Sequence, residues 1–536
     1  MNKDTASNVL RRLDALKALR RPHESVWRQC FEYSYPLRGA GFVSDLVSAE
    51  EARRMRAELL DSTSTDAARI LASGIMSGIT PANSRWFQLD AGEESDDERR
   101  WLDACAQTLW ENIHVSNFDA AAYEALIDVV CAGWFALYVD EMPGVGGLRF
   151  SQWPLSGVYV ASTNSAGSVD TVYRVFKLSA EQAATEFGEE KLSERTLKLA
   201  REKPDEKIDF VHAITPRGDE GKRDGKLARD LPFASVHVEV GEKRLVRESG
   251  YHEMPVIVPR WMLIPDSAYG VGPVFDALPD IKMLNKLKEM ELASAELSIA
   301  GMWIAEDDGV LNPRAVKVGP RKIIVANSVD SMKPLQTGAN FELSEILAEQ
   351  LQRSIRKVLM ADQLQPQNGP QMTATEVHVR VNLIRQLLGP IYGRLQAEYL
   401  QPLIERCFGL AWRAGVFGPA PESLAGREFS IRYLSPLARA QKLDDVTAIE
   451  RYIADVASFA QIFPELVDQI DGARAGRRIA EGLGVPSDVT RSDDEVARVR
   501  DERARQAAQE KAMTRERQGG VGGAMLEKVM NSGGAR

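Results

Sequence analysis

The stretch QMTATEVHVRVNLIRQLLGPIYGRLQAEYLQPLIERCFGLAWRAG, from Gln371 to Gly415, decides the fold. It begins with Thr373 and, three residues later, Glu376, the spacing of a capping box that satisfies the free amides of a first helical turn. Beyond this cap, apolar residues recur every three or four positions, which predicts one continuous stripe along a helix. The stripe consists of Val377, Val381, Ile384, Leu388, Ile391, Leu395, Tyr399, Leu403, Cys407 and Leu410.

The predicted helix is long and contains two prolines, Pro390 and Pro402. Some forty residues at about 1.5 Å each would extend roughly 60 Å, which is too long for the core of one ordinary domain. Each proline removes a backbone donor and crowds the preceding turn. We therefore expect a bent helix here rather than a straight rod.

A polar segment, DQLQPQNGPQ over residues 362–371, precedes the helix and predicts an exposed loop. A polar loop followed by a T-A-T-E-initiated, proline-containing helix resembles the head-to-tail connector, or portal, proteins of short-tailed, T7-like bacteriophages. In that family the loop projects into the central tunnel of a ring, and the helix behind it spans the ring wall. The simpler interpretation of the same residues is a long core helix after an exposed loop. The resemblance implies a tunnel role for Gln363, Gln365, Gln367, Asn368 and Gln371.

The N-terminal part of the chain is similar to the same family. An arginine-containing helix, expected to end at Pro22, is followed by Trp27 and Tyr35-Pro36. Asp61-Ser-Thr63 then opens an alanine-rich helix that is expected to stop at Thr80-Pro81, before Trp86-Phe87. The order of these features, rather than any one of them, carries the resemblance.

A third block, Tyr269-Gly-Val-Gly-Pro273 followed by ALPDIKMLN over 277–285, also resembles the family. Its two glycines do not make a dinucleotide loop, because a proline follows and the third glycine is absent. The helix that continues to about Ala300 looks like the family's stem helix, which helps to line the tunnel. On this helix Lys282, Lys286 and Glu289 share one face.

Periodicity over the whole chain predicts an α+β protein in which helices predominate. Alternating apolar residues predict strands at Val158–Ala161, Val169–Leu178, 208–214 and 236–240, and a further strand is expected at Phe429–Tyr433. Asn117 is expected to cap a helix, a second helix is expected from Phe341 to Ala361, and the chain after Tyr433 is expected to be helical almost to its end. The acids from Glu93 to Glu98 are expected only to compensate the dipole of the helix that they precede.

A capping-box pair, Ser179 and Gln182, is expected to open a helix that continues to about Lys203 with a weak point at Gly188. The resemblance implies a portal fold with wing, stem, clip and crown regions. It divides the chain into an N-terminal wing (1–178), a stem helix (179–203), a β-rich clip (204–262), a second stem helix (263–300), wing (301–361), tunnel loop (362–372), long kinked helix and wing closure (373–435), helical crown (436–517) and flexible C-terminal tail (518–536).

The clip region contains a charged, glycine-rich excursion from Pro216 to Lys226. In the family the clip docks the packaging terminase and later the tail adaptor, which implies docking roles for Arg217, Lys222, Arg223 and Lys226. Three acidic residues in the same segment dilute its positive charge, so a solvated loop is the simpler interpretation.

Composition excludes some classes of function. The 536 residues carry a formal net charge of −10 with 27% charged residues, which does not mark a basic nucleic-acid binder. DNA contact should then be local, weak or of the sliding kind, because tight non-specific binding requires many neutralised phosphates. No run approaches the ~20 apolar residues of a membrane span, and the N-terminus lacks the apolar core of a signal peptide, so we expect a soluble protein without membrane contact.

The sequence contains few candidates for catalytic or metal-binding residues. Four scattered cysteines without a C-x-x-C pair predict reduced thiols rather than disulfides or a zinc site. The sequence contains no G-x-x-x-x-G-K-[ST], H-E-x-x-H or G-x-S-x-G motif, and its six histidines do not pair at ligand spacing. We expect no catalysis, cofactor or metal.

The resemblance, carried by three separated blocks, implies a dodecameric ring at the capsid vertex through which double-stranded DNA is packaged and ejected. Its expected partners are the terminase large subunit, tail adaptor or nozzle proteins, and major capsid and scaffolding proteins, with internal core proteins as an optional addition. The expected location is the virion, after synthesis in the bacterial cytoplasm. Two alternatives stay open: a packaging nuclease, which would need clustered carboxylates for two metals, and a non-viral helical scaffold without a DNA-sized hole.

Overall fold

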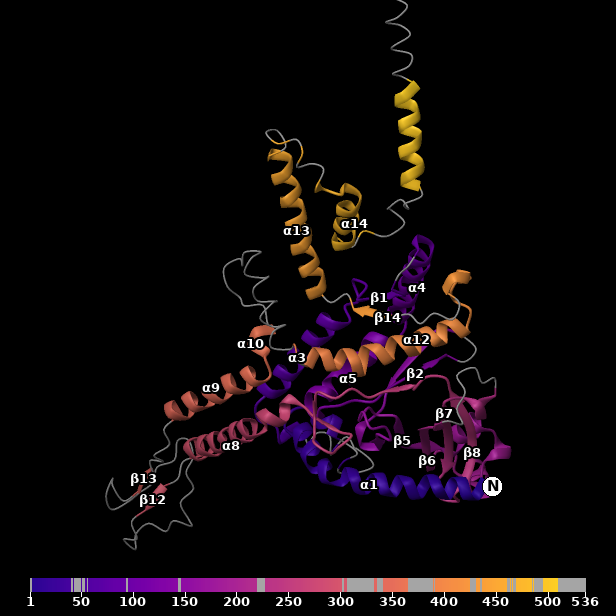
Figure 1. The fold of residues 1–536 in the computed structure, drawn as a ribbon. Helices are drawn as coiled ribbons and strands as arrows, with labels where there is room; N and C mark the ends of the chain where they lie inside the picture. Colours follow the sequence, from indigo (N-terminus) through magenta and orange to yellow (C-terminus); the bar gives the residue numbers. More distant parts are fainter. Residues whose placement is uncertain are drawn as a thin grey trace, which may run out of the picture. The chain divides into compact units, whose positions relative to one another are not determined.

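The computed structural model forms two compact units, Met1–Ser84 with Glu111–Val416, and Arg85–Trp110 with Phe417–Arg536. The residues that it describes are 2–39, 42, 50, 54, 56–92, 95–142, 146–218, 227–300, 303–305, 332–334, 341–364, 389, 391–424, 430–433, 436–459, 463, 465, 469–483, 485 and 495–509. Helices predominate in this part of the chain (Figure 1), as the sequence predicted.

The first unit contains a five-stranded antiparallel sheet in the order β4-β5-β6-β7-β8. Four of its strands lie where alternation predicted them, and the last, β8, follows a short turn. The strands are β4 (Val158–Ala161), β5 (Thr171–Ser179), β6 (Lys207–Pro216), β7 (Phe233–Glu239) and β8 (Arg244–Tyr251).

Helices cover both faces of this sheet. Because successive strand residues point to opposite faces, Val211 on β6 packs against Leu13 and Leu16 of α1 (Asn2–Glu32), whereas its neighbour Phe210 packs against Phe187 of α6 (Ala180–Phe187). Helix α1 crosses the strands, since it contacts both edge strands, β4 and β8, and Figure 1 shows it in indigo beside the sheet. The N-terminal helix is therefore an ordinary packed helix of the core.

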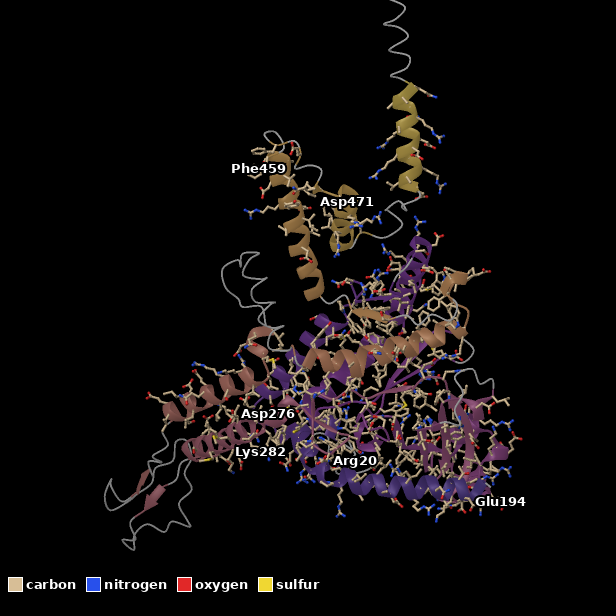
Figure 2. All side chains as sticks on the ribbon, viewed as in Figure 1. Arg20, Glu194, Asp276, Lys282, Phe459 and Asp471 are labelled. Carbon is tan, nitrogen blue, oxygen red and sulfur yellow. The ribbon has the colours of Figure 1, made fainter. Side chains whose placement is uncertain are left out.

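Helix α1 passes through Pro22 and ends at Glu32, so the predicted stop at Pro22 was wrong. The proline removes one backbone hydrogen bond, but buried residues on both sides, Leu16 and Trp27, hold the helix in place. Arg20 adds a polar anchor (Figure 2), since its guanidinium donates to the carbonyl oxygens of Leu155, Ser156 and Val158 at 2.9, 2.8 and 2.6 Å.

The capping box at Ser179 and Gln182 is confirmed. The single helix predicted over 179–203 was wrong, because α6 ends at Gly188, where φ is +84°, and α7 (Glu194–Glu202) begins after a separate cap at Ser193. Strand β5 also pairs with β6 from Val172–Ile214 to Ser179–Lys207. The predicted boundaries at 178 and 204 therefore cut through one continuous sheet.

The rest of the first unit consists of helices and short sheets. Its helices are α3 (Thr63–Ile79), α5 (Phe118–Ala132), α8 (Pro273–Ala300), α9 (Phe341–Val358), α10 (Ala361–Leu364) and α12 (Gln401–Arg413). Its short sheets are β3-β2-β9 (Leu148–Gln152, Leu137–Glu141, Val256–Ile257), β10-β11 (Met262–Leu263, Gly270–Val271) and β12-β13 (Trp303–Ala305, Met332–Pro334).

Close backbone contact explains the Y-G-x-G-P block. Gly133 ends α5 with φ +87°, and a Cβ atom built on it would lie 2.1 Å from the carbonyl carbon of Val271. A Cβ atom on Gly272 would lie 2.5 Å from the carbonyl oxygen of Val130. Only glycine fits at such approaches. The two glycines let the entry to α8 lie directly on the end of α5.

Asn117 precedes α5 as predicted, but its side chain does not cap the helix. It instead pairs with the backbone of Phe150 on β3, donating to the carbonyl oxygen at 2.7 Å and accepting from the amide at 2.9 Å. The amide side chain thus takes the place of a neighbouring strand at this edge.

The second unit contains most of α4 (Asp96–Val115), the pair β1-β14 (Phe87–Asp90 and Ser430–Tyr433), α13 (Pro436–Phe459) and α14 (Gly472–Leu483). Phe87 opposes Tyr433 across the antiparallel pair, which joins segments that lie far apart in the sequence. The strand predicted at 429–433 and the helices predicted after it are confirmed within the described residues.

Two histidines stack inside the five-stranded sheet. The rings of His212 and His237 have centroids 3.9 Å apart, and His212 Nε2 lies 2.9 Å from Ser235 Oγ. Burial lowers the pKa of both imidazoles, and the nearby positive charges of Arg174 and Arg247 act in the same direction. For His237 the pKa falls to about 3.

This pair is expected to make the first unit sensitive to acid. Its histidines take up protons near pH 6.5 in the unfolded chain but only at much lower pH in the folded one. The free energy of unfolding is therefore unaffected by their titration above about pH 6.5, and it decreases as the pH falls toward about 3. When the pH is lowered from about 7 to about 4, the Tm of a His212→Gln, His237→Gln variant should decrease less than that of the parent protein. Thermal melts monitored by circular dichroism would measure this, and equal losses would contradict it.

Candidate DNA channel and docking sites

Helices α8 and α9 form an antiparallel hairpin (Figure 1), and this hairpin carries the predicted channel residues of the stem. Ser354 Oγ donates to Asp280 Oδ2 at 2.6 Å near one end, and Ser344 Oγ donates to Glu291 Oε1 near the other. These two hydrogen bonds fix the register of the helices.

Lys282 points toward α1 rather than to open solvent. Its ammonium donates to Gln29 Oε1 at 2.5 Å and lies 5.6 Å from the ring centroid of Tyr33. Figure 2 labels this residue on α8. The structure therefore separates Lys282 from the exposed pair of Lys286 and Glu289, whose charged atoms are 2.9 Å apart.

The first residues of the predicted loop are helical. Gln363 belongs to the short helix α10, and the methyl groups of Leu364 would lie 3.0 Å from a Cβ atom built on Gly74 of α3. The loop prediction was thus wrong for residues 362–364, because Leu364 packs on the glycine gap of α3. The other four predicted tunnel residues, Gln365, Gln367, Asn368 and Gln371, lie outside the described residues.

A π-helical turn over Gln396–Leu400 precedes α12. The amide of Gln401 donates to the carbonyl oxygen of Gln396, five residues earlier. Pro402 has no amide hydrogen to donate to the fourth preceding carbonyl, and a widened turn is one way in which a helix accommodates this loss. The cap residues Thr373 and Glu376, as well as Pro390, lie outside the described part of the chain.

Glu398 anchors this turn to the rest of the first unit. It accepts from the Arg260 guanidinium at 2.7 and 3.0 Å and from the Arg260 amide at 3.0 Å. Arg260 is buried, whereas the Glu398 side chain is 21% exposed. The bidentate geometry and the opposite charges make these hydrogen bonds strong.

A second anchor holds α12. Glu253, in the connection between β8 and β9, accepts from Arg413 at 2.6 and 2.7 Å and from Arg406 at 3.1 Å. Gly409 lies between the two arginines on the same side of the helix, and a Cβ atom on it would lie 2.3 Å from Glu253 Oε1. The glycine leaves the space that the carboxylate occupies.

The charge environment of Glu253 favours its ionised form. Burial alone would raise its pKa, but the hydrogen bonds and positive charges of Arg413 and Arg406 outweigh this effect and lower the pKa. We call this cluster of Glu253, Arg406 and Arg413 the Glu253 clamp. It ties the connection after β8 to α12.

The predicted docking residue Arg217 has a structural role. Its guanidinium donates to the carbonyl oxygens of Ala228 at 2.8 Å, Leu231 at 2.9 Å and Ser249 at 3.2 Å. These bonds connect Arg217, at the end of β6, to residues 228–231 and to β8. Lys222, Arg223 and Lys226 lie outside the described residues.

The sequence interpretation missed Glu253, Arg260 and Glu398. Each makes contacts more than a hundred positions away in the sequence, so no local pattern could pair them. One usable signal was Arg406-x-x-Gly409-x-x-x-Arg413, which places a gap between two cations on one side of a helix.

The described residues contain no group of three or more histidine, cysteine and carboxylate side chains placed to hold a metal ion. Within the same residues, no helix combines the length and the apolar character needed to cross a bilayer. All four cysteines are buried and unpaired by disulfides.

Comparison with known proteins gives a consistent result. A family described as bacteriophage head to tail connecting protein matches residues 6–490. A probable portal protein of Bordetella phage BPP-1 is 30% identical, over 94% of this chain and 92% of the relative. The portal protein of Salmonella phage epsilon15 is 28% identical over 98% and 96%, and that of Escherichia phage T7 is 22% identical over 90% and 87%.

Proposed function

Because the chain belongs to the family of bacteriophage head to tail connecting proteins, we propose that it assembles as a closed, dodecameric portal ring through which double-stranded DNA enters and leaves the capsid. The observation that carries the proposal is the match of nearly the whole chain to this family and to portal proteins of several phages. A ring of identical subunits repeats one heterologous interface until it closes.

The proposed mechanism is architectural rather than catalytic. A separate terminase ATPase drives the duplex, and this chain supplies the channel and the docking ends. The subunit has a net charge of −10. Tight non-specific binding of DNA requires many lysine and arginine contacts to phosphates, so this charge suits a channel through which DNA passes without being held. Any contact is with the backbone and reads no bases.

The proposed channel wall consists of the polar loop and one flank of α8. Gln365, Gln367, Asn368 and Gln371 supply uncharged polar groups that do not trap phosphates, whereas Gln363 is placed in α10 and supports the base of the loop. On α8 the exposed Lys286 and Glu289 belong to the proposed channel wall. Lys282 does not, because its ammonium is held by Gln29.

The proposed docking partners are the terminase large subunit first and tail adaptor or nozzle proteins later. Lys222, Arg223 and Lys226 stay candidates for this contact, and Arg217 shapes the base of their segment. Capsid and scaffolding proteins complete the proposed partner set, with internal core proteins as an optional member. The wing, stem, clip and crown division stays a prediction, with the sheet of β4 to β8 treated as one body.

The loop role is tested by removing residues 366–370, with a glycine-serine segment of equal length as the control. The shortened protein should assemble like the parent, because its described contacts are untouched, but should package or retain less DNA. The equal-length variant keeps the length of the segment but removes its side chains, so it separates the effect of length from the effect of the side chains. Nuclease-protected DNA per particle would measure both, and normal protection by the shortened variant would refute the loop role.

A further inference from the structure

One face of the five-stranded sheet carries a row of basic side chains. The row crosses neighbouring strands, and each member lies directly opposite the next in the antiparallel register. Its members are Arg174 on β5, His212 on β6, His237 on β7 and Arg247 on β8. Side chains that oppose each other in a sheet point to the same face. We call these residues the basic row.

Side-chain contacts agree with this register. The imidazole rings of His212 and His237 are stacked, with centroids 3.9 Å apart. Trp153 borders one end of the row, since its ring centroid lies 4.7 Å from the guanidinium carbon of Arg174 and 5.8 Å from the His212 ring. Phe187 of α6 borders the other end, 5.6 Å from the His237 ring. Aromatic rings thus frame the basic row.

Arg174 has no oxygen partner. Among the residues that the structure describes, no group accepts a hydrogen bond from its guanidinium, and no carboxylate forms an ion pair with it. Its guanidinium carbon lies 4.7 Å from the ring centroid of Trp153 and 4.8 Å from that of Phe176. Ring faces attract the positive charge but do not accept the N–H donors as oxygens do. Arg174 is partly buried, but its nitrogens stay in contact with solvent.

The rest of the row adds positive charge to this face. Arg247 has one ion pair, at 2.9 Å to the exposed carboxylate of Glu186. Burial lowers the pKa of His212 and His237, the two guanidinium groups lower it further, and no carboxylate counters this effect. His237 Nδ1 is also buried without a hydrogen-bond partner in the described part of the chain. Because protein, water or an ion normally completes such an atom, the basic row is chemically incomplete.

Acids on the surrounding elements have partners of their own. Asp140 of β2 accepts from the Tyr138 hydroxyl at 2.6 Å. Glu239 of β7 accepts from the hydroxyls of Ser193 and Thr196 at 2.5 and 2.6 Å. The positive charge of Arg174 is therefore available to an anion from solution.

We propose that the basic row binds one oxyanion of the phosphate class, with the Arg174 guanidinium as its main donor. A guanidinium matches phosphate oxygens through two parallel hydrogen bonds. A doubly charged oxyanion suits the row better than a single carboxylate does, because two guanidinium groups and the histidine pair share this face. The source is free phosphate or the phosphate groups of a nucleic acid, which present the same oxygens. All members of the row belong to one subunit, so the site does not depend on the proposed ring.

Equilibrium dialysis of the full-length protein against radiolabelled sulfate tests the site. Sulfate has the shape of phosphate and keeps both of its negative charges near neutral pH. The parent protein should bind one sulfate per subunit, and Arg174→Met should bind it at least about tenfold more weakly, equivalent to about 1.4 kcal/mol. Methionine keeps an apolar contact with the rings of Trp153 and Phe176, and circular dichroism would establish that the variant folds.

Two further variants make the test specific. Arg174→Lys retains the charge but not the planar fork, so its affinity should lie between those of the parent and of Arg174→Met. Arg201→Met is the matched control, because Arg201 is an exposed arginine of α7 outside the basic row; it should bind sulfate like the parent. Equal binding by the parent and Arg174→Met would overturn the proposal.

Unlabelled competitors identify the ligand. Phosphate should displace sulfate, whereas acetate at the same ionic strength should not, and the reverse order would overturn the assignment to the phosphate class. Displacement by a short DNA duplex would assign the site to nucleic-acid phosphates. Sulfate that stays bound in the presence of the duplex would assign it to free phosphate.

Discussion

Replacement of Gly133 by alanine is expected to prevent stable folding of the first unit. An alanine at φ +87° adds a Cβ atom 2.1 Å from the Val271 carbonyl carbon and 2.4 Å from the Gly272 amide nitrogen. The left-handed conformation alone costs about 1–2 kcal/mol. The overlap is with backbone, which no rotamer change relieves, so the total should exceed about 4 kcal/mol.

Gly167 provides the matched control for this substitution. It has φ +73°, but a Cβ atom there would meet nothing within 4 Å. Gly167→Ala should therefore show the conformational cost alone and lower Tm by only a few degrees. Soluble yield and thermal melts would compare the two. Similar losses in both variants would contradict the close packing of α5 on the entry to α8.

Removal of Glu253 should have the second largest effect. Arg406 is buried at 3% exposure, and in Glu253→Ala its remaining carboxylate would be Asp140, 3.7 Å away. A buried charge that loses its partner typically costs about 3–5 kcal/mol. Glu202→Ala, which removes the partner of Lys198 in an exposed pair with atoms 3.9 Å apart, should cost less than about 1 kcal/mol.

A double variant separates the cost of losing the ion pair from the cost of leaving the Arg406 guanidinium buried without its partner. Glu253→Ala, Arg406→Met should be less destabilised than Glu253→Ala alone, because no unpaired guanidinium then stays buried. The folded pKa of Glu253 is lowered, so the stabilisation by its ionised form is present above its unfolded pKa and is lost as the pH falls through the folded one. The gap in Tm between parent and Glu253→Ala should narrow in acid, and a constant gap would contradict the clamp.

Local patterns predicted much of the secondary structure. Alternation placed β4 at Val158–Ala161, and the three-to-four periodicity after Phe341 placed α9. The Ser179 capping box could be recognised because both of its partners lie within four residues. A similar box at Ser95 and Glu98, with hydrogen bonds of 2.9 and 3.3 Å, was overlooked because the acidic run suggested only a dipole effect.

The errors arose where tertiary contacts override local propensity. Burial of Leu16 and Trp27 carries α1 past Pro22. Long-range pairing of β5 with β6 joins segments that the family resemblance had assigned to separate regions. Arg217 looked like a docking cation, but its carbonyl partners come from residues eleven and more positions away. The glycines of the Y-G-x-G-P block were found as a pattern, and only their packing on the end of α5 gives their reason. A Cβ atom on Gly270 would lie 2.4 Å from the Gly133 carbonyl oxygen, and one on Gly272 would lie 2.5 Å from that of Val130.

The most direct test of the portal assignment is electron microscopy of the purified full-length protein, with mass measured by light scattering. Closed rings with a central channel wide enough for a B-form duplex are predicted, at a mass of about twelve subunits for a closed homo-oligomer. Monomers or dimers without a channel, at every protein concentration and in the presence of scaffolding protein, would contradict the ring.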